Sequence, residues 1–228
     1  DKLFFSLFDN SENHVAIVKL LAENREGIGE RKLLEHLGAH AIGAKGKRIL
    51  NDLEQTGFIM SFTPIYHKRQ GKYYRLIDEY ALFYLKWIMP IKAELDKNGL
   101  DILYWQIIQE SAEWAAWQGY AFESVCHKHV LTIKRALKLS PTALSGAWRY
   151  APKKGSKKRG AQIDLLFDRR DDAITLCEMK YTKSPFIISK DYFEVLHQKI
   201  TVFRENTQTK KQIFLALISA NGIKKNQY

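Results

Sequence analysis

The sequence predicts an α/β protein in two parts, with short helices and a hairpin in the first and a mixed sheet flanked by helices in the second. Helical and strand-like hydrophobic periods alternate along the 228 residues. Apolar, β-rich runs at 163–168 and 174–180 flank a polar turn, and a helical pattern and another apolar run follow them. We expect the boundary near residue 90, which gives parts of 1–90 and 91–228.

Short helices open the first part. The spacing of apolar residues predicts helices over 12–24, 30–37 and 45–56, and the last two end at Gly38 and Gly57. Glycine commonly ends a helix in this way because it adopts a left-handed conformation without strain. A further helix over 79–88 is predicted, capped by Asp78 and ended by Pro90.

A basic hairpin follows the third helix. The run at 58–63 alternates like a strand, the chain turns at 68–71, and 72–76 returns as a second strand. This is the order of a winged helix, whose third helix normally enters the major groove while the hairpin touches the DNA backbone. A winged helix can also serve only as a protein-binding or interdomain module. The candidate DNA contacts are the cations of that helix and hairpin: Lys45, Lys47, Arg48, Lys68, Arg69 and Lys72.

The hairpin at 163–180 carries the candidate chemistry. Side chains two apart on a strand share a face, so Glu178 and Lys180 project together, and an antiparallel turn through Asp171 and Asp172 brings Asp164 beside them. Two carboxylates can hold Mg²⁺, and a nearby ammonium can stabilise charge on a phosphate or orient an attacking water. The alternative is an exposed hairpin whose charges are solvated.

Two helices contribute further candidates. A helix is predicted over 117–139, where Gly119 would let it approach a sheet closely and Glu123 could lean toward the metal. Otherwise Glu123 is an ordinary surface residue. A second helix over 191–205 carries Gln198 and Lys199 near its middle, where a polar side chain could reach a phosphate or a water. The apolar run that follows, at 213–218, is typical of a fully buried central strand.

The net charge of +11 favours a polyanionic partner. The densest cluster of cations immediately precedes the strand of Asp164, where it could hold a phosphate backbone that the carboxylates would otherwise repel. The alternative is a solvated loop. The cations of this cluster are Lys153, Lys154, Lys157, Lys158 and Arg159.

Further features of the sequence bear on the location of the protein and on the sites that it lacks. The sequence has neither an apolar run of about eighteen residues nor the layout of a signal peptide, so we expect a cytoplasmic protein without membrane contact. Its two cysteines, Cys126 and Cys177, stand in apolar patterns and form no Cys-x-x-Cys pair. A disulfide framework or zinc knuckle is therefore not expected. The segment 41–48 lacks the first Gly and the final Ser or Thr of a phosphate-binding loop.

The order of these elements and four segments of the sequence resemble a known protein family. The order of a helix with Glu123, a strand with Asp164, a strand with Glu178 and Lys180, and a helix with Gln198 resembles the restriction-endonuclease-like superfamily, the PD-(D/E)XK nuclease fold. More narrowly, the chain resembles the C-terminal region of bacterial and archaeal AAA+-type ATPases, in which a winged helix and this nuclease-like domain follow an ATPase domain. The segments that carry the resemblance are YYRLIDEYALFYLKW (73–87), WQGYAFESVC (117–126), GAQIDLLFDR (160–169) and CEMKYTKSPFIISKD (177–191).

The resemblance implies a magnesium-dependent nuclease module that acts on DNA. Asp164 and Glu178 would hold Mg²⁺ or Mn²⁺, Lys180 would support the attacking water and the charge of the transition state, and Glu123 and Gln198 would assist. It also implies a longer protein, whose ATPase domain binds ATP and is a partner of this part. A noncatalytic module that only binds nucleic acid or protein is the alternative.

Overall fold

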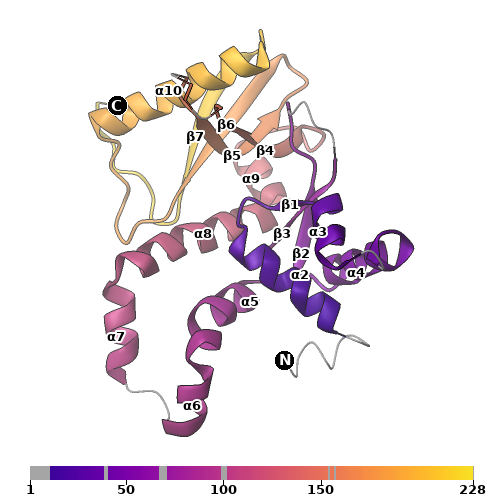
Figure 1. Cartoon of the computed structure of the whole chain (residues 1–228). Helices are drawn as coiled ribbons and strands as arrows, with labels where there is room; N and C mark the ends of the chain where they lie inside the picture. The colour runs from indigo at the N-terminus through magenta and orange to yellow at the C-terminus, as the bar shows by residue number, and fades with distance from the viewer. Residues whose placement is uncertain are drawn as a thin grey trace. The chain divides into compact units, whose positions relative to one another are not determined.

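The computed structural model is a mixed α/β protein, which confirms the predicted class (Figure 1). Its contacts divide the chain into one unit of residues 1–63 and 70–124 and another of residues 64–69 and 125–228, each with its own sheet. The predicted boundary near residue 90 falls inside the first of these units. The structure describes residues 11–38, 41–66, 71–98, 102–153, 155–156 and 158–227.

The first unit packs helices against a small antiparallel sheet of order β1-β3-β2. The two strands of the predicted hairpin are present, and β1 joins them as a strand that the sequence analysis did not identify. Apolar residues of the first three helices meet in one buried core, among them Ile17, Leu33 and Leu53. The elements are α2 (Glu12–Glu23), β1 (Ile28–Gly29), α3 (Glu30–His36), α4 (Ala44–Gln55), β2 (Ile59–Phe62) and β3 (Tyr73–Leu76).

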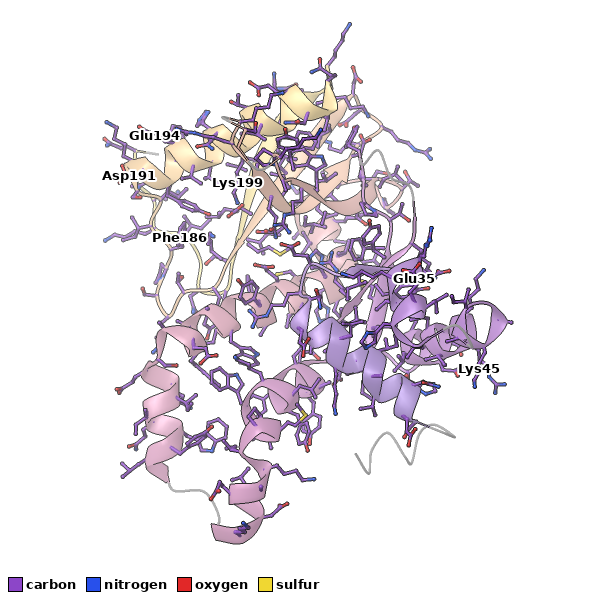
Figure 2. All side chains as sticks on the ribbon, in the orientation of Figure 1. Glu35, Lys45, Phe186, Asp191, Glu194 and Lys199 are labelled. Atoms are coloured by element: carbon purple, nitrogen blue, oxygen red, sulfur yellow. The ribbon has the colours of Figure 1, made fainter. Side chains whose placement is uncertain are left out.

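A glycine allows α4 to enter this core. A Cβ at Gly46 would lie 2.1 Å from the carbonyl oxygen of Ala41 and 2.5 Å from Cδ2 of Leu34. No side chain fits at such distances, so the residue is fixed by packing. The same turn of helix exposes its neighbours Lys45 and Lys47, and Figure 2 labels Lys45 on α4.

Asp78 caps the next helix as predicted, since its Oδ1 accepts a hydrogen bond from the backbone N–H of Ala81 at 2.6 Å. Pro90, however, does not end the helical path. The chain passes through a π-helical turn and then a 3₁₀ turn in which proline occupies an early position, where its missing N–H is not needed. The elements are α5 (Glu79–Phe83), the π-helix η2 (Tyr84–Ile88), η3 (Met89–Ile91), α6 (Lys92–Asn98), α7 (Ile102–Glu110) and α8 (Ala112–Lys128).

The helix predicted over 117–139 is two helices. It breaks at His129, which has φ −107° and ψ 28° and whose N–H bonds to the carbonyls of Val125 and Cys126. The expected close approach at Gly119 is also wrong, because a Cβ there would meet no described atom within 4 Å. The helical pattern of the sequence is continuous across this break, so periodicity alone did not reveal it.

The second unit is a mixed sheet of order β4-β5-β6-β7, in which β5 is antiparallel to both β4 and β6 and β7 is parallel to β6. Figure 1 shows α10 running across this sheet, and Val202 and Phe203 of α10 pack with Leu166 and Leu176. On the opposite face, the ammonium of Lys134 in α9 lies over the ring of Phe167. The elements are α9 (Val130–Ala136), β4 (Leu144–Tyr150), β5 (Ala161–Asp168), β6 (Ala173–Lys180), α10 (Lys190–Thr207) and β7 (Gln212–Ser219).

The position predicted for the last strand is wrong. Among the residues that the structure describes, β7 pairs only with β6 and therefore lies at an edge of the sheet. Phe214 and Leu215 on this strand are 42% and 44% exposed. A continuous apolar run indicates that both faces of a strand are apolar, but it carries no information about strand order. The structure also places β4, a strand that no clear apolar pattern indicated, at the other edge.

None of the described helices is both long and apolar enough to cross a membrane.

Removal of the cap at Asp78 should destabilise the first unit. We expect Asp78→Ala to lower the free energy of unfolding by about 1 kcal/mol, because the N–H of Ala81 loses its acceptor. Urea denaturation of the variant measures this effect. Asp78→Asn, which keeps an acceptor oxygen, is the matched control, and equal stability of the alanine variant and the wild type would show that the cap contributes nothing.

Candidate active site

The candidate site begins at a hairpin of β5 and β6. The two strands pair from Asp168↔Ile174 to Leu165↔Cys177, around a turn in which Asp172 has a φ of 59°. Continued by one residue, this register brings Asp164 opposite Glu178. Here the side chain takes part in the pairing, since Oδ2 of Asp164 accepts a hydrogen bond from the backbone N–H of Met179 at 3.2 Å.

Asp164 is a buried carboxyl group with only 9% of its surface exposed. Burial raises its pKa, and repulsion from Glu178 raises it further. Attraction to Lys199, the hydrogen bond from Met179 and attraction to Lys180 act in the opposite direction without cancelling the increase. The ionised form of Asp164 is therefore disfavoured unless another cation arrives.

Glu178 is more deeply buried, with 3% exposed, yet the balance of effects on its pKa is opposite. Burial raises the pKa, but attraction to Lys199, hydrogen bonds from Lys199 and Tyr192, and attraction to Lys180 together lower it below its ordinary value. Oε2 accepts from Nζ of Lys199 at 2.6 Å. Oε1 accepts from the hydroxyl of Tyr192 at 2.7 Å and lies 3.2 Å from Nζ of Lys180. Glu178 is thus held as a carboxylate.

Helix α10 brings two of these donors to the sheet. Ser189 caps its first turn, with Oγ accepting from the N–H of Tyr192 at 3.2 Å. Tyr192, Leu196 and Lys199 follow one another at helical spacing, so they share a face of the helix, and Leu196 is buried between the two polar residues. In Figure 2, Lys199 lies on the side of α10 that faces the strands.

Tyr192 is fixed by more than its hydroxyl. Its ring makes an edge contact with Phe186 at 5.2 Å, and the ammonium of Lys180 lies 5.1 Å from the ring centre. Burial and the adjacent Glu178 raise the pKa of Tyr192, so the phenol remains a proton donor.

Gln198 points to a different partner. Its Oε1 accepts a hydrogen bond from Nη1 of Arg159 at 2.6 Å, which ties the basic loop to α10 beside the turn that carries Lys199. Lys153 and Lys158 of that loop are exposed. Lys154 and Lys157 lie outside the described residues.

The remaining predicted residues belong to the first unit or are not described. Glu123 lies on α8 in the first unit, and its role at the carboxylates stays a prediction. Lys45, Lys47 and Arg48 are exposed on α4, and Arg48 approaches Asp52 at 4.0 Å. Lys68 and Arg69 lie outside the described residues. Lys72, which was also a candidate contact, pairs with Glu54 at 3.3 Å.

Sequence reasoning missed the roles of Tyr192 and Lys199. The sequence analysis assigns no role to Tyr192, and it predicts for Lys199 only a position near the middle of its helix, where it could reach a phosphate or a water. One signal was available, because Lys199 follows Tyr192 by two helical turns and so stands on the same face. A lysine on a face that covers a sheet requires a buried acceptor.

Comparisons of the chain with protein-family models, with curated proteins and with solved structures found no match.

The donor chemistry of the site fits a hard divalent cation in part. Asp164 and Glu178 are the oxygen ligands that Mg²⁺ prefers, and their mutual repulsion is what a shared cation would relieve. Within the described part of the chain, no group of three or more His, Cys, Asp or Glu side chains gathers as a metal site. Water or phosphate oxygens would have to supply the remaining ligands, as is common for Mg²⁺.

Asp164 should weaken the fold once it is ionised. Its pKa is higher in the folded than in the unfolded chain, so between these two pKa values the folded state binds more protons. The free energy of unfolding therefore falls as pH rises from the unfolded to the folded pKa. We expect Asp164→Asn to be more stable than the wild type at neutral pH in EDTA, with the difference shrinking as pH falls and vanishing below the ordinary Asp pKa of about 3.9. Thermal unfolding across the pH range measures this.

Asp171→Asn is a control, because the pKa of Asp171 is shifted in the opposite direction to that of Asp164. The hydrogen bond from Arg169 lowers the pKa of Asp171, so this substitution should give no gain at neutral pH. If Asp164→Asn is as stable as the wild type at every pH, the charge at Asp164 carries no penalty.

Proposed function

We propose that this chain is a metal-dependent nuclease module that hydrolyses phosphodiesters, with DNA as its substrate. The observation that carries the proposal is the buried pair Asp164 and Glu178, with the ammonium of Lys180 3.2 Å from Glu178 at the end of the same strand. Such a set suits metal-assisted hydrolysis, in which a cation and an ammonium stabilise charge on a phosphate. The finer fold assignments, a winged helix and a restriction-endonuclease-like domain, are part of this proposal.

Each residue would have a distinct task. Asp164 and Glu178 would hold Mg²⁺ or Mn²⁺, which when bound would polarise the phosphate and acidify a water. Lys180 is about one-third exposed, so its ammonium is open to a substrate while remaining beside Glu178. Tyr192 keeps Glu178 oriented. Arg159, held by Gln198, is placed to contact a neighbouring phosphate.

The proposal includes two further elements, a DNA contact of the first unit and a separate ATPase domain. The exposed cations of α4 support a DNA contact through the first unit, since the helix after α3 is the one that a winged helix places in the major groove. Assignment to the C-terminal part of an AAA+-type ATPase, with ATP bound by a separate domain, is supported only by the resemblance of the four quoted segments.

A noncatalytic nucleic-acid-binding or protein-binding module is the second candidate. It is favoured by one observation, that both oxygens of Glu178 already accept hydrogen bonds from protein groups. Glu178 therefore has its charge satisfied without a metal.

The first test is cleavage of supercoiled plasmid with Mg²⁺, Mn²⁺ or EDTA. We expect Lys180→Ala to lower the cleavage rate about a hundredfold or more, because an electrostatic contact made where charge develops typically contributes about 3 kcal/mol. Its affinity for DNA should be nearly unchanged. Asp164→Ala should remove the response to metal, since one carboxylate holds a hard cation poorly.

Lys183→Ala is the matched control for charge, since Lys183 is exposed in the segment that follows β6. Wild-type protein that binds DNA but never cleaves it, even when joined to an ATPase domain, would favour the noncatalytic module. Cleavage that persists in both site variants would point to a contaminating nuclease.

The basic loop should bind phosphates without reading sequence. Each phosphate contact adds about 0.9 to the slope of log affinity against log salt. We expect Lys158→Ala and Arg159→Ala each to reduce that slope and to weaken binding equally for duplexes of different sequence. Fluorescence anisotropy across a salt series measures both. Lys224→Ala and Lys225→Ala, in the exposed C-terminal segment, are controls, and an unchanged slope in the loop variants would exclude the loop from binding.

A further inference from the structure

The donors around the two carboxylates are unevenly distributed. Glu178 receives Lys199 at 2.6 Å, Tyr192 at 2.7 Å and Lys180 at 3.2 Å. The hydrogen bond to Asp164 that accompanies them comes from a backbone N–H, at 3.2 Å. Lys199 therefore donates to Oε2 of Glu178, the carboxylate that is already better satisfied, and it also attracts Asp164.

Lys199 and a divalent cation would compete for the same atom. A cation shared by Asp164 and Glu178 needs an oxygen of each, at the short distances of about 2.0–2.6 Å that Mg²⁺, Mn²⁺ and larger hard cations require. Oε2 of Glu178 holds an ammonium at 2.6 Å, and Oε1 holds the Tyr192 hydroxyl with Lys180 beside it. In a site that is 3% exposed at Glu178, little water screens the repulsion between ammonium and metal.

A phosphate can remove this competition. The side chain of Lys199 is 21% exposed, so its ammonium is not sealed in the core. Two further cations are close in the structure: Arg159 is tied to Gln198, the neighbour of Lys199 on α10, and the half-buried Lys180 shares Glu178 with Lys199. A phosphodiester attracted there would provide Lys199 with a new counter-ion.

We propose that Lys199 is a positioning residue that couples metal binding to substrate binding, occupying Glu178 until a phosphodiester takes its ammonium and leaves the carboxylate to the metal. The inference rests on the proposed function and adds a regulation of the same site. Because coupling between two ligands is reciprocal, DNA should tighten metal binding by the factor with which metal tightens DNA binding. Without nucleic acid, the module would stay poorly loaded with metal.

A Lys180 variant is the control that distinguishes coupling through Lys199 from the effect of removing any positive charge near Glu178. It carries the same charge, lies 3.2 Å from Glu178 and also attracts Asp164, so its removal relieves similar repulsion. It shares Oε1 with Tyr192, however, and its loss leaves the Lys199 contact on Oε2 intact. Coupling through Lys199 therefore predicts different behaviour for the two lysine variants.

The experiment measures Mn²⁺ binding by the electron paramagnetic resonance signal of the free ion, with and without a short DNA duplex. Without DNA, Lys199→Met should bind Mn²⁺ about tenfold more tightly than the wild type, within the usual range for coupled sites. DNA should tighten Mn²⁺ binding by a similar factor in the wild type but not in Lys199→Met. Lys180→Met should keep the DNA effect, and Lys199→Arg should behave as the wild type.

Lys199→Gln protects the test against a variant that fails to fold, because its amide can still donate to Glu178 without a charge. Metal binding by Lys199→Met and Lys199→Gln that is no tighter than in the wild type would overturn the inference, as would an equal DNA effect in all variants. In either case the wild type still binds Mn²⁺, so the proposed function stands. If neither the wild type nor the Lys199 variants bind Mn²⁺, with or without DNA, the proposed function fails and the inference fails with it.

Discussion

The charge of Glu178 is the constraint on which the second unit depends. A carboxylate with 3% exposure has lost its water and remains ionised only if protein donors replace that water. Two of the donors, Tyr192 and Lys199, come from α10, so the helix must lie across the sheet at one rotation about its axis. The buried contacts of Val202 and Phe203 with the strands hold the same orientation, so packing and electrostatics agree.

Two neighbouring carboxylates in this unit have opposite environments. Glu178 is surrounded by cations and donors that lower its pKa, whereas burial and Glu178 itself raise the pKa of Asp164. Such a difference is typical of functional sites, where the surroundings shift the pKa values of two neighbouring titratable groups in opposite directions. A purely structural ion pair would gain nothing from the second, poorly compensated carboxyl group, because burying charge without a partner is unfavourable.

Helix α10 also connects the carboxylates to the basic loop. Gln198 and Lys199 are adjacent in the chain but leave the helix in different directions, one to Arg159 and the other to Glu178. One rigid element therefore positions a loop cation and a site cation together. This matters for a polyanion because cations fixed on a shared scaffold lose less freedom when a phosphate binds than cations on independent loops would.

Features that depend on residues close together in the chain could be predicted from the sequence. The alternation of side chains along a strand placed Asp164 and Glu178 on one face of a hairpin, and the Asp78 cap follows from residues within one helical turn. The edge position of β7 and the contact of Lys199 with Glu178 became visible only in the folded structure. Strand order and the rotation of a packed helix are set by contacts between distant segments, and hydrophobic period records which faces are apolar without recording what covers them.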